Sequence, residues 1–416
     1  MKTYLVGGSV RNYLLRLPVI DNDWVVVGGC PDYFLKNNFK QVGKQFPVFL
    51  HPKTNEEYAL ARTEKKSGRG YNGFSVNFSS DITLEEDLYR RDLTINAIAQ
   101  DIHGNFIDPF NGIRDLKLKV LKHISPSFSE DPLRVLRVAR FLAALSHMGF
   151  QIASSTFKLM SQMVIEKELI YLEPYRIWKE TEKALKTPDP HIYFRVLQQC
   201  GAIRFLFPEL FFLWNIDHNT GFFFGSSFKK KMFLFNIASI VKVSNRIDVR
   251  FASLFQFAIS NFFSRKSISY NHVEHYSIDL LKKFFKRLRV PSSISNLAIF
   301  TFKFHTFLIN VYYCTSFDIL KFFQYINAWR NTVVIDLLVI LVDNYYCFFN
   351  KNYDSKKNIL LPGKFLKRIF YVAKLVSVSC VIKDGFKGKE ISEELFIRRK
   401  IAIDIWRKKN KNKLFF

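Results

Sequence analysis

At 416 residues and 48% apolar content, the chain is long enough for two to four domains with substantial cores. A formal net charge of +26 predicts a polyanionic partner, nucleic acid before a membrane surface, although part of the lysine content is also typical of an AT-rich genome. The five cysteines are scattered and show neither the spacing typical of a metal site nor that of a redox motif, which suits a reducing cytoplasm. We expect no signal peptide and no membrane segment, because the apolar runs are too short or broken by charges.

Residues 5–27 are expected to form a strand, a Gly-Gly turn, a helix and a second strand that begins with Asp21 and Asp23. Alternate side chains of a strand share a face, so the two carboxylates should point the same way. They repel each other unless a cation lies between them, and hard oxygen ligands suit Mg²⁺. The glycine turn, the helix start and Arg11 offer a phosphate close approach, free N–H groups and positive charge. These are the parts of a phosphoryl-transfer site.

Each signal is weak alone, since a Gly-Gly turn is usually only a turn and an Asp-x-Asp pair is more often a solvated loop or helix cap. Their combination at this spacing resembles the signature of the DNA polymerase beta-like nucleotidyltransferase superfamily. That superfamily spans many substrates, so the later residues must distinguish among them.

Short strands and helices continue to about residue 120, with a helix expected around 33–37 and a strand at 57–62. Residues 63–75 hold three glycines among basic residues, which predicts a mobile loop, either a lid over a triphosphate or a plain connector.

Residues 85–100 fit a helix with one apolar face. Arg91 and Asp92 lie among its apolar residues, where an unpaired charge is costly. Asp92 fits a structural pair with an arginine as well as a functional role, whereas Arg91 looks more like a phosphate or sugar contact.

From about Ser129 onward the chain is expected to be helical. Arg134, Arg137 and Arg140 recur every three residues in the segment 129–142 and trace a cationic stripe around the helix. A solvated face would mix in other polar residues, so this pattern favours a partly buried groove for anionic ligands.

The remaining helices give weaker signals. In the helix predicted over 169–186, Arg176 and Glu180 are expected to pair at i,i+4. Residues 385–416 form a basic helix and tail, for which a polyanion contact and a solvated end are equally compatible with the sequence.

In order, these stretches resemble the class II tRNA nucleotidyltransferases, the bacterial CCA-adding enzymes. The resemblance spans nearly the whole chain, densely through residue 210 and thinly after it. The matching stretches include YLVGGSVRNYLL, DNDWVVVG, EEYALARTEKKSGRGYNGF, RRDLTINAIA, DPFNG, EDPLRVLRVARF, YRIWKETEKAL, LRVP and GFKGKEISEEL.

The resemblance implies an α+β fold: a nucleotidyltransferase head with a small sheet at 1–128, then an all-α neck at 129–206, a body at 207–330 and a tRNA-contacting tail at 331–416. It also implies roles for individual residues. By this resemblance, Asp21 and Asp23 would be the Mg²⁺ ligands, and the nucleotide contacts would be Gly8, Arg11, Arg91, Arg137 and Arg140. The protein template for the incoming base is Glu130, Asp131 and Arg134.

The template has a physical basis. Cytosine and adenine each show an amino donor beside a ring-nitrogen acceptor, and the carboxylate of Asp131 with the guanidinium of Arg134 complements both edges. Uracil and guanine turn a carbonyl toward the carboxylate and an N–H toward the guanidinium, and such mispaired groups are costly enough to exclude both bases.

One departure concerns a His-Asp phosphohydrolase site that many bacterial members carry. In RFASLFQF, at 250–257, Gln256 and Phe257 stand where His and Asp would be. We expect a helix at 251–263 that is buried as core, in a hydrolase-like region that is only a scaffold.

The resemblance implies template-independent addition of CCA to tRNA from CTP and ATP, in the cytoplasm and with no protein partner expected. The alternatives are a poly(A) polymerase-like enzyme that uses ATP alone and a catalytically silent tRNA-binding protein.

Overall fold

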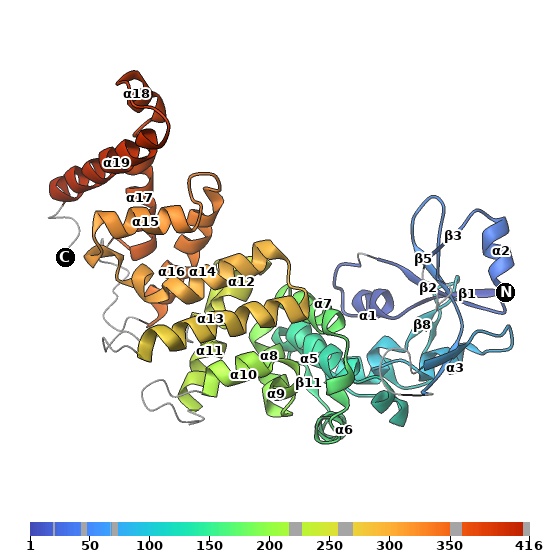
Figure 1. Cartoon of the computed structure of the whole chain (residues 1–416). Helices are drawn as coiled ribbons and strands as arrows, with labels where there is room; N and C mark the ends of the chain where they lie inside the picture. Colours follow the sequence, from blue (N-terminus) through green and yellow to red (C-terminus); the bar gives the residue numbers. More distant parts are fainter. Residues whose placement is uncertain are drawn as a thin grey trace. The chain divides into compact units, whose positions relative to one another are not determined.

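The computed structural model describes residues 1–19, 21–42, 48–66, 68, 74–215, 227–256, 269–349 and 360–410. They form two compact units, Met1–Pro208 and Glu209–Phe416, which are described separately (Figure 1). All described strands belong to the first unit, and the second unit is helical wherever it has regular structure, as expected for the predicted α+β fold. The finer division into head, neck, body and tail stays a prediction.

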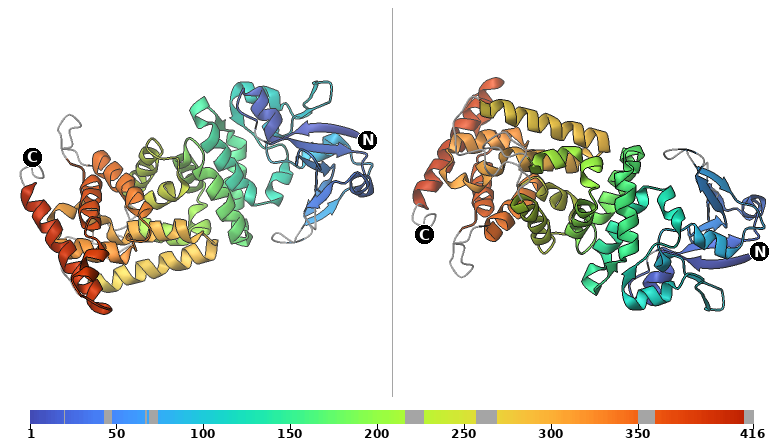
Figure 2. Two further views of the ribbon diagram at one scale, coloured as in Figure 1. Left: turned by 90° about the horizontal axis from the view of Figure 1, so that it is seen from above. Right: turned by 90° about the horizontal axis from the view of Figure 1, so that it is seen from below.

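Seven short strands of the first unit form a mixed sheet in the order β3-β4-β5-β2-β1-β8-β9. The blue arrows near the N-terminus in Figure 2 belong to this sheet. β2 is parallel to β5, and the other neighbouring strands are antiparallel. The strands are β1 (Lys2–Val6), β2 (Asp23–Val27), β3 (Lys40–Val42), β4 (Val48–Leu50), β5 (Glu57–Leu60), β8 (Ala99–Gln100) and β9 (Phe106–Ile107). Apolar side chains on the two faces form small cores around Val25 and Phe49. Helix α1 (Gly8–Leu14) follows β1 directly, and α2 (Pro31–Lys36) follows β2.

The helix predicted over 85–100 is wrong beyond its first third. Helix α3 (Leu84–Tyr89) ends there, and the chain continues through a 3₁₀ turn, η1 (Thr94–Asn96), into β8. Asp92 explains the break, because its buried carboxylate accepts hydrogen bonds from the Leu93 N–H and from Asn96 Nδ2, both at 2.9 Å. The apolar residues expected to face inward are buried all the same: Leu88, Leu93, Ile95, Ala97 and Ile98.

The loop predicted over 63–75 begins and ends in an antiparallel hairpin of β6 (Thr63–Lys66) and β7 (Phe74–Asn77). The expectation of irregular structure is therefore wrong at both ends. The alternating sequence FSVN of the second strand was the missed signal. Residues 67 and 69–73 of the predicted lid lie outside the described residues.

Helices complete the first unit. The 3₁₀ turn η2 (Pro126–Glu130) and Pro132 at the cap delay the start of the arginine-bearing helix, α5, to Leu133. This helix packs against α7 and α8. The remaining elements are α4 (Gly112–Leu118), α5 (Leu133–Leu145), α6 (Ser154–Ile165), α7 (Pro174–Leu185), α8 (Pro190–Gln199) and α9 (Ile203–Leu206), with a parallel pair of β10 (Val120–Leu121) and β11 (Gln151–Ile152).

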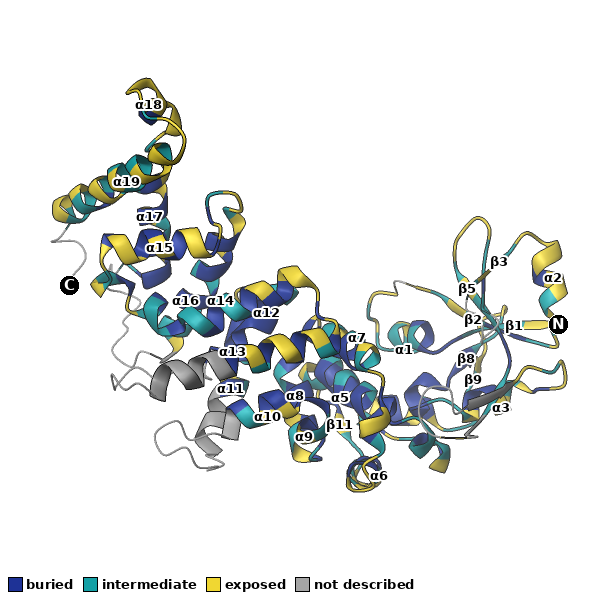
Figure 3. Ribbon diagram, viewed as in Figure 1, coloured by how far each residue is buried: buried dark blue, intermediate teal, exposed yellow. Residues whose placement is uncertain are grey.

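In the second unit, α12 packs on α14, α16 on α17, and α19 on α15 and α17. Figure 3 shows the buried faces of these helices. None of the described helices is long and apolar enough to cross a membrane. The helices are α10 (Pro208–Asn215), α11 (Ser227–Ile240), α12 (Ile247–Ser253), α13 (Ser269–Leu288), α14 (Ser292–Ile309), α15 (Ser316–Tyr325), α16 (Val333–Phe349), α17 (Pro362–Lys374), α18 (Val378–Lys383) and α19 (Lys389–Lys409).

The degenerate hydrolase motif lies at the end of α12. This helix ends at Ser253, so the helix predicted over 251–263 is wrong for residues 254–256, and residues from Phe257 to 268 lie outside the described residues. Gln256 is fully buried, accepts a hydrogen bond from Asn236 Nδ2 at 2.9 Å and donates one to the carbonyl of Leu341 at 3.1 Å. Both ends of its amide therefore join helices together.

Candidate active site

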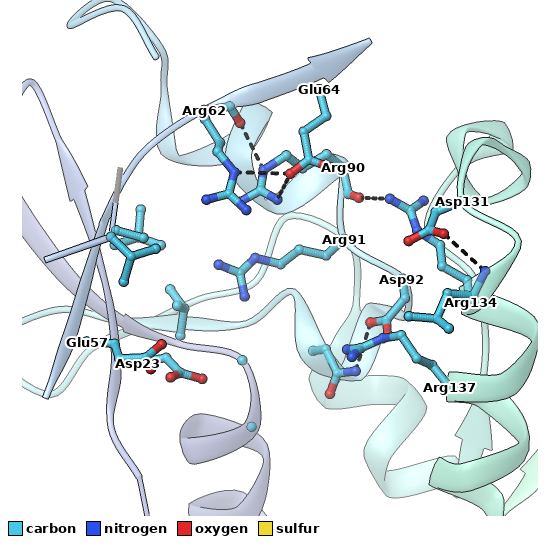
Figure 4. A pocket seen from close by; sticks show the side chains of 18 of the residues that line it. Asp23, Glu57, Arg62, Glu64, Arg90, Arg91, Asp92, Asp131, Arg134 and Arg137 are labelled. Atoms are coloured by element: carbon cyan, nitrogen blue, oxygen red, sulfur yellow. Dashed lines mark hydrogen bonds and ion pairs between the residues drawn. The ribbon is translucent and has the colours of Figure 1, made fainter. Parts of the chain in front are cut away.

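A cavity of about 600 Å³ lies in the first unit, between the sheet and helix α5 (Figure 4). Its walls come from the turn between β1 and α1, from β2 and β5, from the turn after α3, and from α5 and α7. The predicted site residues that line it are Gly8, Arg11, Asp23, Arg91, Asp131, Arg134 and Arg137. Asp21, Glu130 and Arg140 are not among the lining residues.

The glycine turn forms one wall of the cavity. Gly7 has a φ of +74°, which favours glycine, and a Cβ atom there would lie 3.1 Å from Arg91 Nη1. Gly8 begins α1, and a Cβ atom on Gly8 would meet only the end of the Arg11 side chain, at 3.6 Å. The turn thus exposes backbone to the cavity beside two guanidinium groups, an arrangement suited to an anion.

Acidic side chains gather at the sheet end of the cavity. Strand β2 begins at Asp23, so the prediction that it begins with Asp21 is wrong by two residues. Partial desolvation raises the pKa of Asp23, the charge of Arg91 offsets part of this effect, and the charge of Asp21 raises the pKa of Asp23 again. Glu57, which pairs with Asp23 in the β2–β5 register, lies beside it in Figure 4. A bound cation would relieve this crowding of negative charge.

Three arginines surround the ring of Phe141 on α5. The guanidinium carbons of Arg11, Arg137 and Arg140 lie 5.0, 5.4 and 4.2 Å from its centroid. Burial and the charges of Arg140 and Arg137 lower the pKa of Arg11 to about 10. Like charges held together in this way favour an anionic ligand that would separate them.

Buried acids hold two of these arginines in place. Asp92 accepts from Arg137 Nε at 2.7 Å, and Glu180 accepts from Arg140 Nε at 2.6 Å. Burial alone would raise the pKa of Asp92, but the charge of Arg137 holds it well below its usual range. The structural Arg–Asp pair considered for Asp92 therefore exists. The expected Arg176–Glu180 pairing is wrong, because Glu180 turns toward α5.

Arg91 reaches from the turn after α3 into the cavity, toward Asp23 (Figure 4). Its Nη2 donates to Asp87 Oδ2 at 3.0 Å, while its buried Nε has no hydrogen-bond partner among the described residues. Asp87 is fully buried and also accepts from Arg90 Nη2, at 2.6 Å, so one carboxylate orients two consecutive arginines. The ion pairs with Arg90 and Arg91 overcome the effect of burial and lower the pKa of Asp87 to about 2.

Asp131 and Arg134 lie at the end of the cavity formed by α5. Arg134 donates to the carbonyl of Ser127 at 2.8 Å and to that of Arg90, which uses two of its five N–H donors. Asp131 accepts from the Leu133 N–H at 3.1 Å and from Arg176 Nη2 at 2.9 Å. Each side chain is fixed by the protein and keeps hydrogen-bonding capacity for a ligand.

Reasoning from the sequence missed Glu57, Asp87 and Phe141. The signal for Glu57 was present, because a strand parallel to β2 would bring its first residue beside Asp23. Asp87 and Phe141 gave no local signal, since their roles arise from contacts across the fold. Among the described residues, no group of three or more His, Cys, Asp and Glu side chains is placed to hold a metal ion.

Comparison with known proteins shows to which nucleotidyltransferase family the chain belongs. Residues 3–122 match the family model described as the poly A polymerase head domain, and residues 149–213 match the probable RNA and SrmB-binding site of polymerase A. A CCA-adding enzyme of Buchnera aphidicola subsp. Schizaphis graminum is 48% identical over 413 residues, which cover 99% of this chain and 98% of that protein. The chain belongs to the CCA-adding enzymes.

Solved structures of CCA-adding enzymes share the fold. One, a complex with ATP, has a TM-score of 0.65 at 23% identity and covers 97% of this chain and 86% of its own. Another, the Thermotoga maritima CCA-adding enzyme complexed with tRNA-CCA, has a TM-score of 0.62 at 22% identity and covers 97% of this chain and 87% of its own. The family resemblance and the fold class stated from the sequence motifs are confirmed.

Proposed function

We propose that this protein adds the CCA end to tRNA, transferring two CMP and one AMP from CTP and ATP without a nucleic-acid template. In each step the 3′-hydroxyl oxygen of the RNA bonds to the α-phosphorus, the bond to the β-phosphate breaks and pyrophosphate leaves, while the hydroxyl proton passes to solvent. The observation that carries this proposal is one cavity that holds both a phosphate-type end and a base-type end.

At the phosphate end, we assign Gly8 and Arg11 to the triphosphate and Arg91, Arg137 and Arg140 to the rest of the nucleotide. Support comes from the clustering of Arg11, Arg137 and Arg140 around one ring. The side chain of Arg91, which lines the same cavity, adds a further positive charge there. An incoming triphosphate would neutralise these charges, so binding gains from the repulsion that the free protein holds.

We assign Asp21 and Asp23 as ligands of Mg²⁺; Glu57, which pairs with Asp23 across the strands, adds negative charge nearby and is not assigned as a ligand. The mutual repulsion of Asp21 and Asp23 fits a cation at this place, and Mg²⁺ commonly binds one or two carboxylates and completes its shell with water and substrate phosphates. When bound, the ion would supply charge neutralisation and polarise the attacking hydroxyl.

At the base end, we assign Asp131 and Arg134 as the groups that read the base edge, with Glu130 beside them. The main chain and Arg176 hold both groups in place. Hydrogen-bonding groups that are fixed in place increase discrimination between bases, because they cannot rearrange to pair with a wrong base. Since cytosine and adenine present the same donor and acceptor order, one pair of side chains can serve CTP and ATP.

The names of the relatives favour CCA addition over poly(A) synthesis, and the exposed acid at Asp23 in a formed cavity speaks against a silent binding protein. The tRNA is the partner that best suits the net charge of +26. The cytoplasmic location expected from the sequence stays a prediction.

The test is incubation of the protein with tRNA lacking CCA and one labelled nucleotide at a time. CTP alone should extend the tRNA by two residues, and ATP should add one residue only after them. Long A tails from ATP alone, with no use of CTP, would contradict this proposal and would show a poly(A) polymerase activity instead.

A further inference from the structure

The ring of Phe141 is the one feature of the candidate active site that neither the phosphate assignment nor the base assignment uses. Phe141 belongs to α5, lines the cavity and is 5% exposed. The other apolar residues of α5 are all Leu, Val or Ala. Packing alone would be satisfied by one of these residue types, so the aromatic ring needs another explanation.

Acids balance two of the three guanidinium groups over this ring. Arg137 and Arg140, both on α5, donate to Asp92 and Glu180 at 2.7 and 2.6 Å. The third guanidinium group belongs to Arg11, which comes from α1 on another wall of the cavity. The cluster therefore joins two elements that are far apart in the sequence.

Arg11 is held by neutral groups. Within the part of the chain that the structure describes, its hydrogen bonds go to amide oxygens: to Asn12 Oδ1 from Nε at 3.2 Å and from Nη2 at 2.9 Å, and to Asn96 Oδ1 from Nη1 at 2.6 Å. Burial and the charge of Arg140 lower the pKa of Arg11 to about 10, and the charge of Asp92 offsets only part of this effect. The positive charge of Arg11 is thus in an unfavourable place when no anion is bound.

The ring of Phe141 supplies an attraction that the amides lack. The faces of an aromatic ring carry partial negative charge and attract a guanidinium group within about 6 Å, more strongly where water is excluded. The guanidinium carbon of Arg11 lies 5.0 Å from the ring centroid. A carboxylate in the same place would also hold Arg11, but it would repel an anionic ligand, whereas the ring leaves the full charge of Arg11 available.

We propose that Phe141 is a positioning residue, whose ring holds Arg11 in the free protein at the place where the triphosphate of the incoming nucleotide binds. This role rests on the proposed function, because it assumes a polyphosphate ligand. Without the ring, repulsion from Arg140 would move Arg11 out of place in part of the molecules, and the apparent affinity would fall with the fraction that remains competent. A bound triphosphate holds Arg11 by itself, so the ring should affect binding and not the rate of the bound complex.

Fluorinated phenylalanine at position 141 tests the proposal without changing the shape of the site much. One, two and three fluorine atoms withdraw increasing electron density from the faces of the ring, and calorimetry with inorganic tripolyphosphate measures the affinity of each form. The affinity should fall stepwise, by about tenfold over the series. A wild type that does not bind tripolyphosphate, or equal affinities across the series, overturns the proposal.

The matched control is the same series at Phe194 on α8, which packs against Tyr193 and Phe207 in the same unit. It should leave the affinity for tripolyphosphate unchanged, and an equal fall at both positions would overturn the proposal. The effect of fluorine at position 141 should also disappear in Arg11→Gln. An undiminished effect in that variant would show that the ring does not act through Arg11.

Kinetics separate positioning from a merely structural role. Phe141→Leu should raise the KM for CTP by about tenfold in the addition to tRNA lacking CCA and leave kcat within about twofold of the wild type. A fall in kcat with an unchanged KM would contradict the proposal. Normal CCA addition with a flat fluorine series would remove only the role of Phe141, whereas stepwise loss of tripolyphosphate binding in a protein that adds no CCA would support that role and refute the proposed function.

Discussion

At the scale of single residues, the proposed base end of the cavity depends on Asp131 and Arg134, which the protein already holds in place. Asp131→Ala or Arg134→Ala removes one half of the complementary edge. UTP and GTP should then compete with CTP and ATP, since a mispaired group no longer costs binding energy. Misincorporation into tRNA lacking CCA measures this, and Arg204→Ala, at an exposed arginine on α9, is the control. Unchanged selection among the four nucleotides in both variants would contradict the template role.

The buried Asp92–Arg137 pair makes a separate prediction about acid stability. The pKa of Asp92 is lowered in the folded protein, so its ionised form stabilises the fold above the unfolded pKa of about 4, and this contribution is lost as the pH falls below that value. Asp92→Asn should cost about 2 kcal/mol at pH 7, because Arg137 loses its partner, and less at pH 3, where part of the contribution remains because the lowered pKa keeps Asp92 ionised in the folded protein. Urea unfolding midpoints at both pH values measure the difference.

Asp81→Asn, at an exposed acid of the same unit, should change little at either pH. A destabilisation by Asp92→Asn that is equal at pH 7 and pH 3 would show that the charge of Asp92 does not contribute.

At the scale of elements, two helix starts depend on glycine for different reasons. A Cβ atom on Gly112, at the start of α4, would lie 2.3 Å from the Thr94 carbonyl oxygen under η1, whereas one on Gly8 meets no backbone. Gly112→Ala should therefore destabilise the fold by about 1–3 kcal/mol through overpacking. Gly8→Ala should leave the melting temperature unchanged but weaken nucleotide addition, since the methyl group lies where a triphosphate would approach. A Gly8→Ala variant with a lowered melting temperature, or a Gly112→Ala variant with an unchanged one, would contradict these assignments.

The same scale shows what local sequence could and could not predict. The order of strand, glycine turn, helix and strand follows from β-branched runs and glycine positions, so residues 5–27 were predicted closely except for the start of β2. The turn around Asp92 was not, because a buried carboxylate that binds its own backbone overrides an apolar pattern typical of a helix. The ends of the β6–β7 hairpin were missed because glycines and basic residues dominate that stretch.

At the scale of the whole chain, prediction was limited by contacts between distant residues. The arginine stripe on α5 was visible in the sequence, but its partners were not: Asp92 and Glu180 lie 45 and 40 residues away from the arginines that they bind. The cavity arises because the sheet and α5 bring such residues together. A motif can therefore identify residues of the site, but only the fold shows which of them other side chains hold in place.

The second unit yields a prediction about an absent activity. Gln256 uses its amide oxygen and nitrogen to join α11 and α16, and it offers no ligand atom to a metal. The purified protein should release no phosphate from 2′,3′-cyclic nucleotides or pyrophosphate with Ni²⁺, Mn²⁺ or Mg²⁺. Metal-stimulated release that persists in Asp23→Ala would reveal a second site and contradict this interpretation of the motif.

We propose that the cavity between the sheet and α5 builds the CCA sequence through Asp21 and Asp23. Sequencing the 3′ ends of tRNA lacking CCA, after incubation with all four nucleotides, tests it most directly. The wild type should leave CCA and nothing longer, while Asp21→Ala and Asp23→Ala should leave the tRNA unextended but still bound, because the phosphate and base contacts remain. Ends extended within tenfold of the wild-type rate in both variants, or tails of another sequence from the wild type, would contradict the account.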